Sequence, residues 1–428
     1  METDLRHREQ TTTVNEEQNH NMRSFKNPRT MDFKAKKFET RESLLTVLFQ
    51  ESEEIRVIYN LFAAIFVLFF LRALVDDIFT HGMPFHHFWL VVWNFEQFPA
   101  TMLVWLLMFL STFVPYTAFR IWAYIPAKTN NFRMVPILLL YVLYLVALFY
   151  FPLRFLFSRQ LNCACSFIIT CETTRIAMKL HSFLRENLPR AIAKRNSDEV
   201  VQPVTLQWPT IEQYVYFMFC PSFIYRDEYP RSHSRCLKKA SIHFFHCFIL
   251  IEFVNLLFTQ YVFPWLDSLD YPYLSLTEIV TSLFAGILPG MLCLICLFYG
   301  LLHSWLNGFA ELMQFGDRQF YLNWWNVNNM AEYYRNWNLV VHDWLYAYVY
   351  RDVSKLIGGR RGLQVAQTIV FFLSAAFHEY WFGVAFRVFY PVMFMLYFVF
   401  GSIFFSVSRL IKNKSVWNTA LWFNLLIG

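Results

Sequence analysis

Charged side chains are scarce in this 428-residue chain. Lys, Arg, Asp and Glu make up 16% of it, whereas 56% of its residues are hydrophobic. Soluble domains carry roughly 25% charged residues, so this chain has too few to cover a water-facing surface. Several apolar runs instead approach the roughly 20 residues that a helix needs to cross a bilayer. The composition argues against a soluble globular protein and predicts an all-α polytopic membrane protein.

The sequence also lacks the short motifs of several enzyme classes. It contains no GxSxG nucleophile elbow, no P-loop and no HExxH, which disfavours a serine hydrolase, an ATPase and a zinc protease. Among the eight cysteines, Cys293 and Cys296 form a CxxC pair, but no second pair or His pair completes a metal site. We therefore expect packing thiols, no metal and no cofactor.

We expect no cleavable signal peptide, because some fifty residues at the N-terminus are polar. Residues 1–42 lack apolar periodicity and are expected to form a disordered cytosolic tail. Residues 43–428 are expected to form one membrane-embedded domain. Its candidate spans are residues 57–75, 101–119, 135–151, 162–183, 241–263, 279–302, 363–384 and 390–410. A further apolar run begins near residue 416 and is too short to cross a core of about 30 Å, so we expect about nine transmembrane helices, the last incomplete.

The fourth candidate span carries three charged residues, Glu172, Arg175 and Lys179. Ionisable groups at membrane depth are costly and usually face the interior of a bundle. We therefore expect this helix to be buried among the others.

Loop charges predict the orientation of the spans. The loops after the first and fifth spans are acidic, with Asp76 and Asp77 in one and Asp267 and Asp270 in the other. The loops about 184–239 and 303–362, and the segment 409–414, are basic and are expected in the cytosol. The net charge of +6 thus reports membrane orientation, and we expect no nucleic-acid partner.

His378 is the first candidate for chemistry. It lies in the middle of an apolar helix, where an ionisable residue is usually functional. Apolar surroundings favour a neutral imidazole, which can accept a proton as a general base. Ser374 lies four residues earlier on the same face and could bond the imidazole or a bound carbonyl. The alternative is a structural histidine hydrogen-bonded within the bundle.

Residues 303–362 form a polar, aromatic segment, which we call the platform. Within it, Arg335, Asn338 and His342 are spaced to lie on one face of a helix. Asn can both donate to and accept from a substrate, and Arg can pair with phosphate. The alternative is a polar stripe facing the cytosol, although Trp324, Trp325, Trp337 and Trp344 lie nearby in the sequence.

Further platform residues have two open interpretations. Arg318, Lys355, Arg360 and Arg361 could contact the phosphates of a nucleotide-like carrier or, for the last three, could be ordinary positive-inside anchors. Tyr350 could face the site or a lipid headgroup.

These stretches resemble the membrane-bound O-acyltransferases, most closely the sterol O-acyltransferases, over nearly everything after about Ser43. The FYLNWWN run resembles an acyl-CoA signature whose positions here are Phe320, Tyr321, Asn323, Trp324, Trp325 and Asn326. Asn323 stands where that signature has Asp. WNLVVHDW from Trp337 and HEY from His378 resemble the segments with the family's functional Asn and catalytic His.

The resemblance implies a membrane-bound O-acyltransferase fold that transfers a long-chain acyl group from acyl-CoA to a sterol 3β-hydroxyl. His378 would be the base, Asn338 would stabilise the carbonyl or position acyl-CoA, and Arg335, His342, Tyr350 and Ser374 would line the acyl-CoA path. It further implies an endoplasmic-reticulum membrane location, contact with membrane lipids, and a homodimer or homotetramer. Two alternatives remain open: diacylglycerol as the acceptor, or a weakened relative that binds lipid without turnover, as suggested by Asn323.

Overall fold

The computed structural model describes residues 33–125, 134–196, 207–269 and 273–427. Within these ranges the chain is almost wholly helical, and its β-structure consists of two isolated bridges. Six helices are long and apolar enough to cross a membrane: Glu53–His81, His86–Tyr124, Met134–Ser158, Leu237–Asp267, Leu276–Met313 and Gly359–Phe386. A shorter apolar helix follows at Val392–Ser408. The expected polytopic all-α membrane fold is confirmed.

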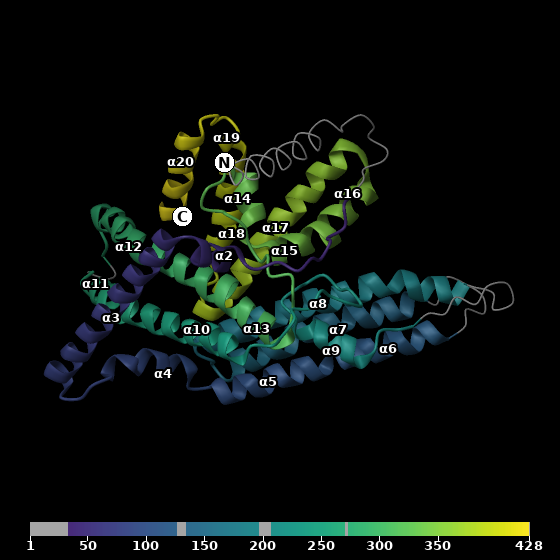
Figure 1. The fold of residues 1–428 in the computed structure, drawn as a ribbon, viewed down its shortest axis with the longest axis horizontal. Coiled ribbons are helices and arrows are strands. Elements are labelled where there is room, and N and C mark those ends of the chain that lie inside the picture. The colour runs from purple at the N-terminus through teal and green to yellow at the C-terminus, as the bar shows by residue number, and fades with distance from the viewer. Residues whose placement is uncertain (1–32, 126–133, 197–206, 270–272, 428) are drawn as a thin grey trace.

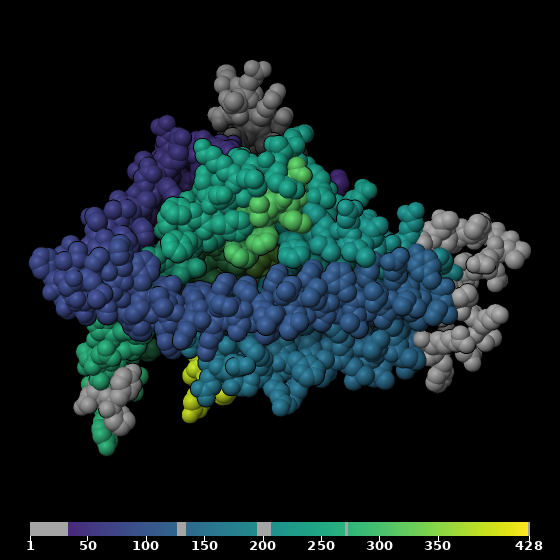
Figure 2. Space-filling view, turned by 90° about the horizontal axis from the view of Figure 1, so that it is seen from below, coloured from purple at the N-terminus to yellow at the C-terminus, as the bar shows by residue number. Residues whose placement is uncertain are grey.

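Two groups of helices lie at opposite ends of the molecule (Figure 1). At one end α5 (Phe98–Ser111), α6 (Phe113–Tyr124) and α7 (Met134–Ser158) pack along α8 (Cys163–Asn196). At the other end α3 (Glu53–His81) and α12 (Leu276–Leu297) pack against α10 (Leu237–Leu257). Blue residues of the N-terminal half form a band across the face shown in Figure 2. Most apolar side chains of α3 are exposed in the chain, as expected of positions that meet lipid tails.

The charged helix α8 lies in the interior, as the sequence predicted. Lys179 is 2% exposed, and its ammonium group donates to the backbone carbonyls of Phe217 and Cys220 at the end of α9 (Ile211–Phe219). Glu172 accepts hydrogen bonds from Arg175. These partners offset the cost of burying each charge. Residues 197–206 of the expected basic loop lie outside the described residues.

One predicted span is divided into two helices at a single residue, Thr112. Residues 101–119 were expected as a single helix, but α5 ends at Ser111 and α6 begins at Phe113. Pro115 has no backbone N–H, so it cannot continue the hydrogen-bond ladder across this point. The backbone N–H and the hydroxyl of Thr112 both donate to the Phe109 carbonyl, at 3.1 and 2.7 Å.

Several spans contain π-helical turns. They are η3 (Phe258–Val262), η4 (Phe298–Trp305), η5 (Leu345–Tyr350) and η6 (Met395–Phe400). Such turns are rare and frequently occur at functional sites. Three of them, η4, η5 and η6, adjoin the platform or the helix of His378, so this part of the molecule is a candidate functional site.

The C-terminal third surrounds α17 (Gly359–Phe386). The segments α16 (Arg351–Ile357), α18 (Val392–Phe394) and η6 pack against it. After α19 (Gly401–Ser408), α20 (Lys414–Ile427) turns back and buries Trp417 and Leu421 completely. The short apolar run expected near residue 416 is therefore a packed helix.

A buried cluster of ionisable side chains joins α3 to α10. Asp77, which we expected in a loop, lies in the last turns of α3, and its carboxylate is 2.5 Å from His87 Nδ1. The other ring nitrogen of His87 lies 3.2 Å from Glu252 Oε1 on α10. All three side chains are at most 9% exposed, so His87 is the group that separates two buried carboxylates.

Replacing His87 with Leu removes the hydrogen-bonding group between Asp77 and Glu252 and leaves their carboxyl groups buried together. Leaving a buried polar group without its partner costs about 1–3 kcal/mol, so we expect a clear loss of thermal stability in detergent, measured by fluorescence-detected size-exclusion chromatography. His86→Leu is the control, because His86 is its exposed neighbour. Equal melting temperatures for the two variants would contradict this interpretation.

Candidate active site

The His378 ring is held by its own helix. Its Nδ1 lies 2.7 Å from the backbone carbonyl oxygen of Ser374, one turn earlier in α17. A carbonyl oxygen can only accept, so Nδ1 carries the proton and Nε2 carries the free lone pair. The imidazole is thus set in the tautomer that can take a proton at Nε2. The contact uses the Ser374 backbone, not the hydroxyl that we considered from the sequence.

Aromatic rings cover the imidazole. Tyr397 of η6 stacks on it with ring centroids 4.3 Å apart and planes 19° from parallel. Trp381 lies on another side at 4.9 Å, and its indole N–H donates to Thr174 of α8. The ring is half-buried among protein groups, so it does not project freely into lipid.

Asn338 marks a break between two platform helices. α14 (Met330–Trp337) ends there, and α15 (Leu339–Trp344) begins after it. The φ of Asn338 is −142°, and its side-chain oxygen accepts from the backbone N–H of Val341 at 3.1 Å. It is therefore the N-cap of α15. The side-chain amide retains two N–H donors for another partner.

This break corrects one prediction. Arg335, Asn338 and His342 do not lie on one face of a single helix, because the chain leaves helical geometry at Asn338. Arg335 is exposed at the end of α14, whereas His342 is half-buried on α15 with its Nδ1 3.4 Å from Asp343 Oδ1.

A row of rings follows His342 along the helix. His342, Tyr346 and Tyr350 are four residues apart, and neighbouring rings stack at 6.3 and 5.8 Å with interplanar angles of 13° and 18°. Phe33 packs against both tyrosines. Tyr350 therefore belongs to an aromatic row that begins at a predicted acyl-CoA residue.

The FYLNWWN motif separates into buried and exposed members. Phe320, Tyr321 and Trp324 are at most 3% exposed, whereas Asn323 and Asn326 face outward. Trp325 is half-buried. The buried rings pack against Phe298 of η4 and Trp337 of α14. The motif is thus chiefly the packing centre of the platform, and Asn323 occupies a position where its side chain fills no cavity.

His303 is a polar residue that the sequence analysis did not single out. It is 2% exposed at the end of η4, and its Nδ1 lies 2.7 Å from the Tyr321 hydroxyl. The Asn307 amide and the Ser43 hydroxyl complete the cluster. The signal available was its place at the start of the polar platform directly after an apolar run.

Residues 33–43 form an extended segment across the platform, which we call the strap. Residues 1–42 were expected to form a disordered tail. Residues 1–32 lie outside the described part, whereas residues 33–42 lie in an extended conformation across the platform. Arg41 exchanges backbone hydrogen bonds with Gly316 and Arg318, each 2.9 Å. A side chain at Gly316 would bring its Cβ within 2.9 Å of the Pro230 carbonyl oxygen, so this crossing requires glycine.

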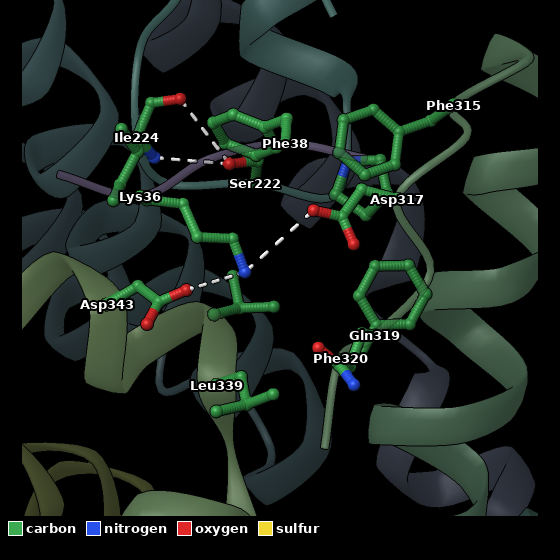
Figure 3. A pocket seen from close by; sticks show the side chains of 12 residues that line it. Lys36, Phe38, Ser222, Ile224, Phe315, Asp317, Gln319, Phe320, Leu339 and Asp343 are labelled. Carbon is green, nitrogen blue, oxygen red and sulfur yellow. Dashed lines mark hydrogen bonds and ion pairs between the residues drawn. The ribbon is translucent and has the colours of Figure 1, made fainter. Parts of the chain in front are cut away.

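Lys36 of the strap lies between two carboxylates (Figure 3). Its Nζ is 3.0 Å from Asp343 and 3.9 Å from Asp317, beside a cavity of about 20 Å³. Burial opposes ionisation of Asp343, but His342 and Lys36 hold its pKa below the ordinary value. Burial raises the pKa of Asp317. No pattern in the polar tail pointed to Lys36.

The cationic residues considered as phosphate contacts have different environments. Arg318 is 5% exposed and forms an ion pair with Glu311 at 2.5 Å, so it is not available to a phosphate and that prediction is wrong for Arg318. Lys355, Arg360 and Arg361 are exposed where α16 meets α17, which leaves both interpretations of them open.

The platform contacts the helix of His378 directly. Tyr334 of α14 lies edge-on to Phe371 of α17 at 5.3 Å. Its hydroxyl approaches Gly401 of α19, where an added Cβ would lie 3.0 Å away. α14, which ends just before Asn338, therefore touches α17 through this ring pair and packs against α19.

Comparisons with known proteins give one family. Residues 121–428 match the model of the membrane-bound O-acyltransferase family. Sterol O-acyltransferase 1 of Mus musculus is 37% identical over 412 residues, which cover 94% of this chain and 75% of the mouse protein. Sterol O-acyltransferase 1 of Cricetulus griseus is also 37% identical, over 98% of this chain and 76% of its own length. Sterol O-acyltransferase 2 of Homo sapiens is 35% identical over 92% and 74%, respectively.

Replacing Lys36 with Met keeps the length of the side chain and removes its charge. A partly exposed ion pair contributes up to about 1 kcal/mol, so we expect the strap to open roughly fivefold more often and chymotrypsin to cut at Phe33 and Phe38 correspondingly faster. Lys37→Met is the matched control, because the Lys37 side chain is 85% exposed. A cleavage rate unchanged by Lys36→Met would show that the ion pairs do not hold the strap.

Proposed function

The chain belongs to the membrane-bound O-acyltransferase family, and from this membership we propose that it esterifies the 3β-hydroxyl of a sterol with a long-chain acyl group. It is an acyl-CoA-dependent O-acyltransferase with multiple membrane spans. The observation that carries the choice of acceptor is 33–37% identity, over 92–98% of the chain, to relatives named sterol O-acyltransferases.

We infer that His378 is the general base. Its Nε2 takes the proton of the sterol hydroxyl as that oxygen attacks the thioester carbonyl carbon of acyl-CoA. The C–S bond then breaks, and the resulting imidazolium returns the proton to the CoA sulfur, so that sterol ester and CoA are formed. The Ser374 carbonyl supports this role because it holds the proton on Nδ1 throughout.

Direct transfer fits the surroundings better than an acyl-enzyme. Nucleophilic catalysis needs a hydroxyl or thiol within hydrogen-bonding reach of the base. In the described part of the chain, the His378 ring donates its hydrogen bond to the backbone carbonyl of Ser374. The sterol hydroxyl itself is then the group that the base activates.

Asn338 is proposed to donate to the acyl carbonyl. Its side-chain oxygen is engaged in the cap of α15, which turns the amide into a fixed donor. His342 and Tyr350 would line the acyl-CoA path through the aromatic row, and Arg335 is exposed to contact the charged end of the carrier. Ser374 would line the same path from α17.

The membrane location and the oligomeric state are inferred from the relatives. We propose residence in the endoplasmic-reticulum membrane and assembly as a homodimer or homotetramer, with no cofactor beyond acyl-CoA as co-substrate. A CoA head group is too polar to cross a bilayer, so it would approach the platform from the cytosol while the sterol enters from the lipid.

The purified chain is expected to convert labelled oleoyl-CoA and cholesterol into cholesteryl oleate, with little product from diacylglycerol. His378→Ala should lower kcat by about 10²–10⁴, the contribution typical of a general base. His81→Ala, at an exposed position on α3, serves as the control. Products are separated by thin-layer chromatography. Triacylglycerol as the main product would assign the other acceptor, and full activity of His378→Ala would reject the base.

The Asn338→Asp variant distinguishes the capping of α15 by Asn338 from its proposed hydrogen bond to the acyl carbonyl. Asp caps helices about as well as Asn, but an ionised carboxylate donates no hydrogen bond. We therefore expect a folded protein whose kcat falls by about 10²–10³, as for the loss of one oxyanion donor. Asn329→Asp is the matched control, since Asn329 caps α14 in the same way through the N–H of Glu332. Equal activities for the two variants would mean that Asn338 is structural.

A further inference from the structure

Two contacts of the HEY segment have no part in the proton transfer described above. Tyr397 stacks on the face of the His378 ring, and the carboxylate of Glu379 accepts a hydrogen bond from the backbone N–H of Phe394 at 2.9 Å. Both contacts join α17 to the α18–η6 segment. They therefore link the ring to a part of the chain that neither the base nor the platform supplies.

The Ser374 hydrogen bond alone leaves the ring under-restrained. It holds the Nδ1 edge, but the second torsion of a histidine side chain has a broad energy well. The plane of the ring can tilt about that anchored edge, and Nε2 would move with it. A flat partner against the ring face removes this freedom, and Tyr397 is placed 19° from parallel at 4.3 Å.

The sequence after α17 brings Tyr397 to that place. Arg387 adopts a left-handed φ of 56° and ends the helix, and the Val388 N–H returns to the Gly383 carbonyl at 3.1 Å. A Cβ at Gly383 would lie 3.2 Å from the Val388 carbonyl oxygen, so the turn is closely packed. The chain therefore reverses direction and comes back along α17.

Glu379 fixes the position of the α18–η6 segment along α17. Its carboxylate binds the N–H of Phe394, which lies one turn before Tyr397. N–H groups at the start of a helix have no partner within that helix, so the carboxylate satisfies one that would otherwise be open. Since Glu379 directly follows His378, the base and the anchor of its covering ring are neighbours in the chain.

We propose that Tyr397 is a positioning residue for His378, and that Glu379 sets Tyr397 in place by holding the first turn of its helix. The tyrosine ring aligns the imidazole so that Nε2 points at the substrate hydroxyl, and its own hydroxyl takes no part in proton transfer. This assignment rests on the proposed function, because the alignment of the imidazole matters for catalysis when His378 is the general base.

The first test is Tyr397→Leu beside Tyr397→Phe in the purified full chain. Misplacing a catalytic group by about 1 Å costs up to about 100-fold, so Tyr397→Leu should lower kcat roughly 10–100-fold with the KM for oleoyl-CoA within about twofold. Tyr397→Phe keeps the flat ring and should restore most of the rate. Phe398→Leu, at the next position of η6, is the control for loss of packing.

The second test addresses Glu379 and does not depend on one variant folding. Glu379→Gln can still accept from Phe394 and should retain most of kcat, whereas Glu379→Leu cannot and should resemble Tyr397→Leu. A kcat for Tyr397→Leu within about threefold of the parent would overturn the proposal. So would an equal loss in Phe398→Leu, which would mark the effect as general packing.

A third measurement separates failure of this inference from failure of the proposed function. Diethyl pyrocarbonate modifies the unprotonated nitrogen of a neutral histidine, and peptide mass spectrometry reports its rate at His378. Release of the ring in Tyr397→Leu should raise that rate relative to Tyr397→Phe, even in a chain that esterifies no sterol. Equal modification rates in the two variants would reject the positioning role, whatever the acceptor proves to be.

Discussion

The hydrogen bond from His378 Nδ1 to the Ser374 carbonyl is the interaction on which the rest of the site depends. It lies within one helix, so packing changes elsewhere do not easily break it. By keeping the proton on Nδ1, it leaves a single lone pair on Nε2 in surroundings with few competing donors. The apolar helix α17, which is long enough to cross a membrane, thus also fixes the orientation of the imidazole.

The platform differs from α17 because it holds many polar groups within a nearly apolar bundle. Most of them are used by one another: His303 with Tyr321, Arg318 with Glu311, and the oxygen of Asn338 with the start of α15. This pairing explains why residues that look equivalent in the sequence, such as Arg318 and Arg335, differ in exposure.

Much of the fold was predictable because it follows from one property, the length of apolar runs. The spans around α3, α7, α10 and α17 were expected on that basis, and the buried position of α8 was expected from its three charged residues. The details of the site were not. A spacing of three and four residues predicted one helix through Asn338, but that asparagine forms a cap, and spacing alone does not distinguish the two.

The contacts that were missed share a physical cause. Lys36 meets Asp343, and His87 lies between Asp77 and Glu252, across long stretches of chain. Tyr397 reaches His378 because the chain reverses direction after α17 and returns along it. Local patterns carry no information about such encounters, since these depend on how whole helices are docked.

The π-helical turn at η6 has a consequence for how this segment can vary. A wider turn holds an additional residue, so removing one residue from Met395–Phe400 would return the segment to ordinary helical winding. Residues beyond the deletion would then keep their orientation, whereas the side chains within the turn would shift by one position, about 100° around the axis. The number of residues between Pro391 and Gly401 therefore determines which side chain of this segment faces His378.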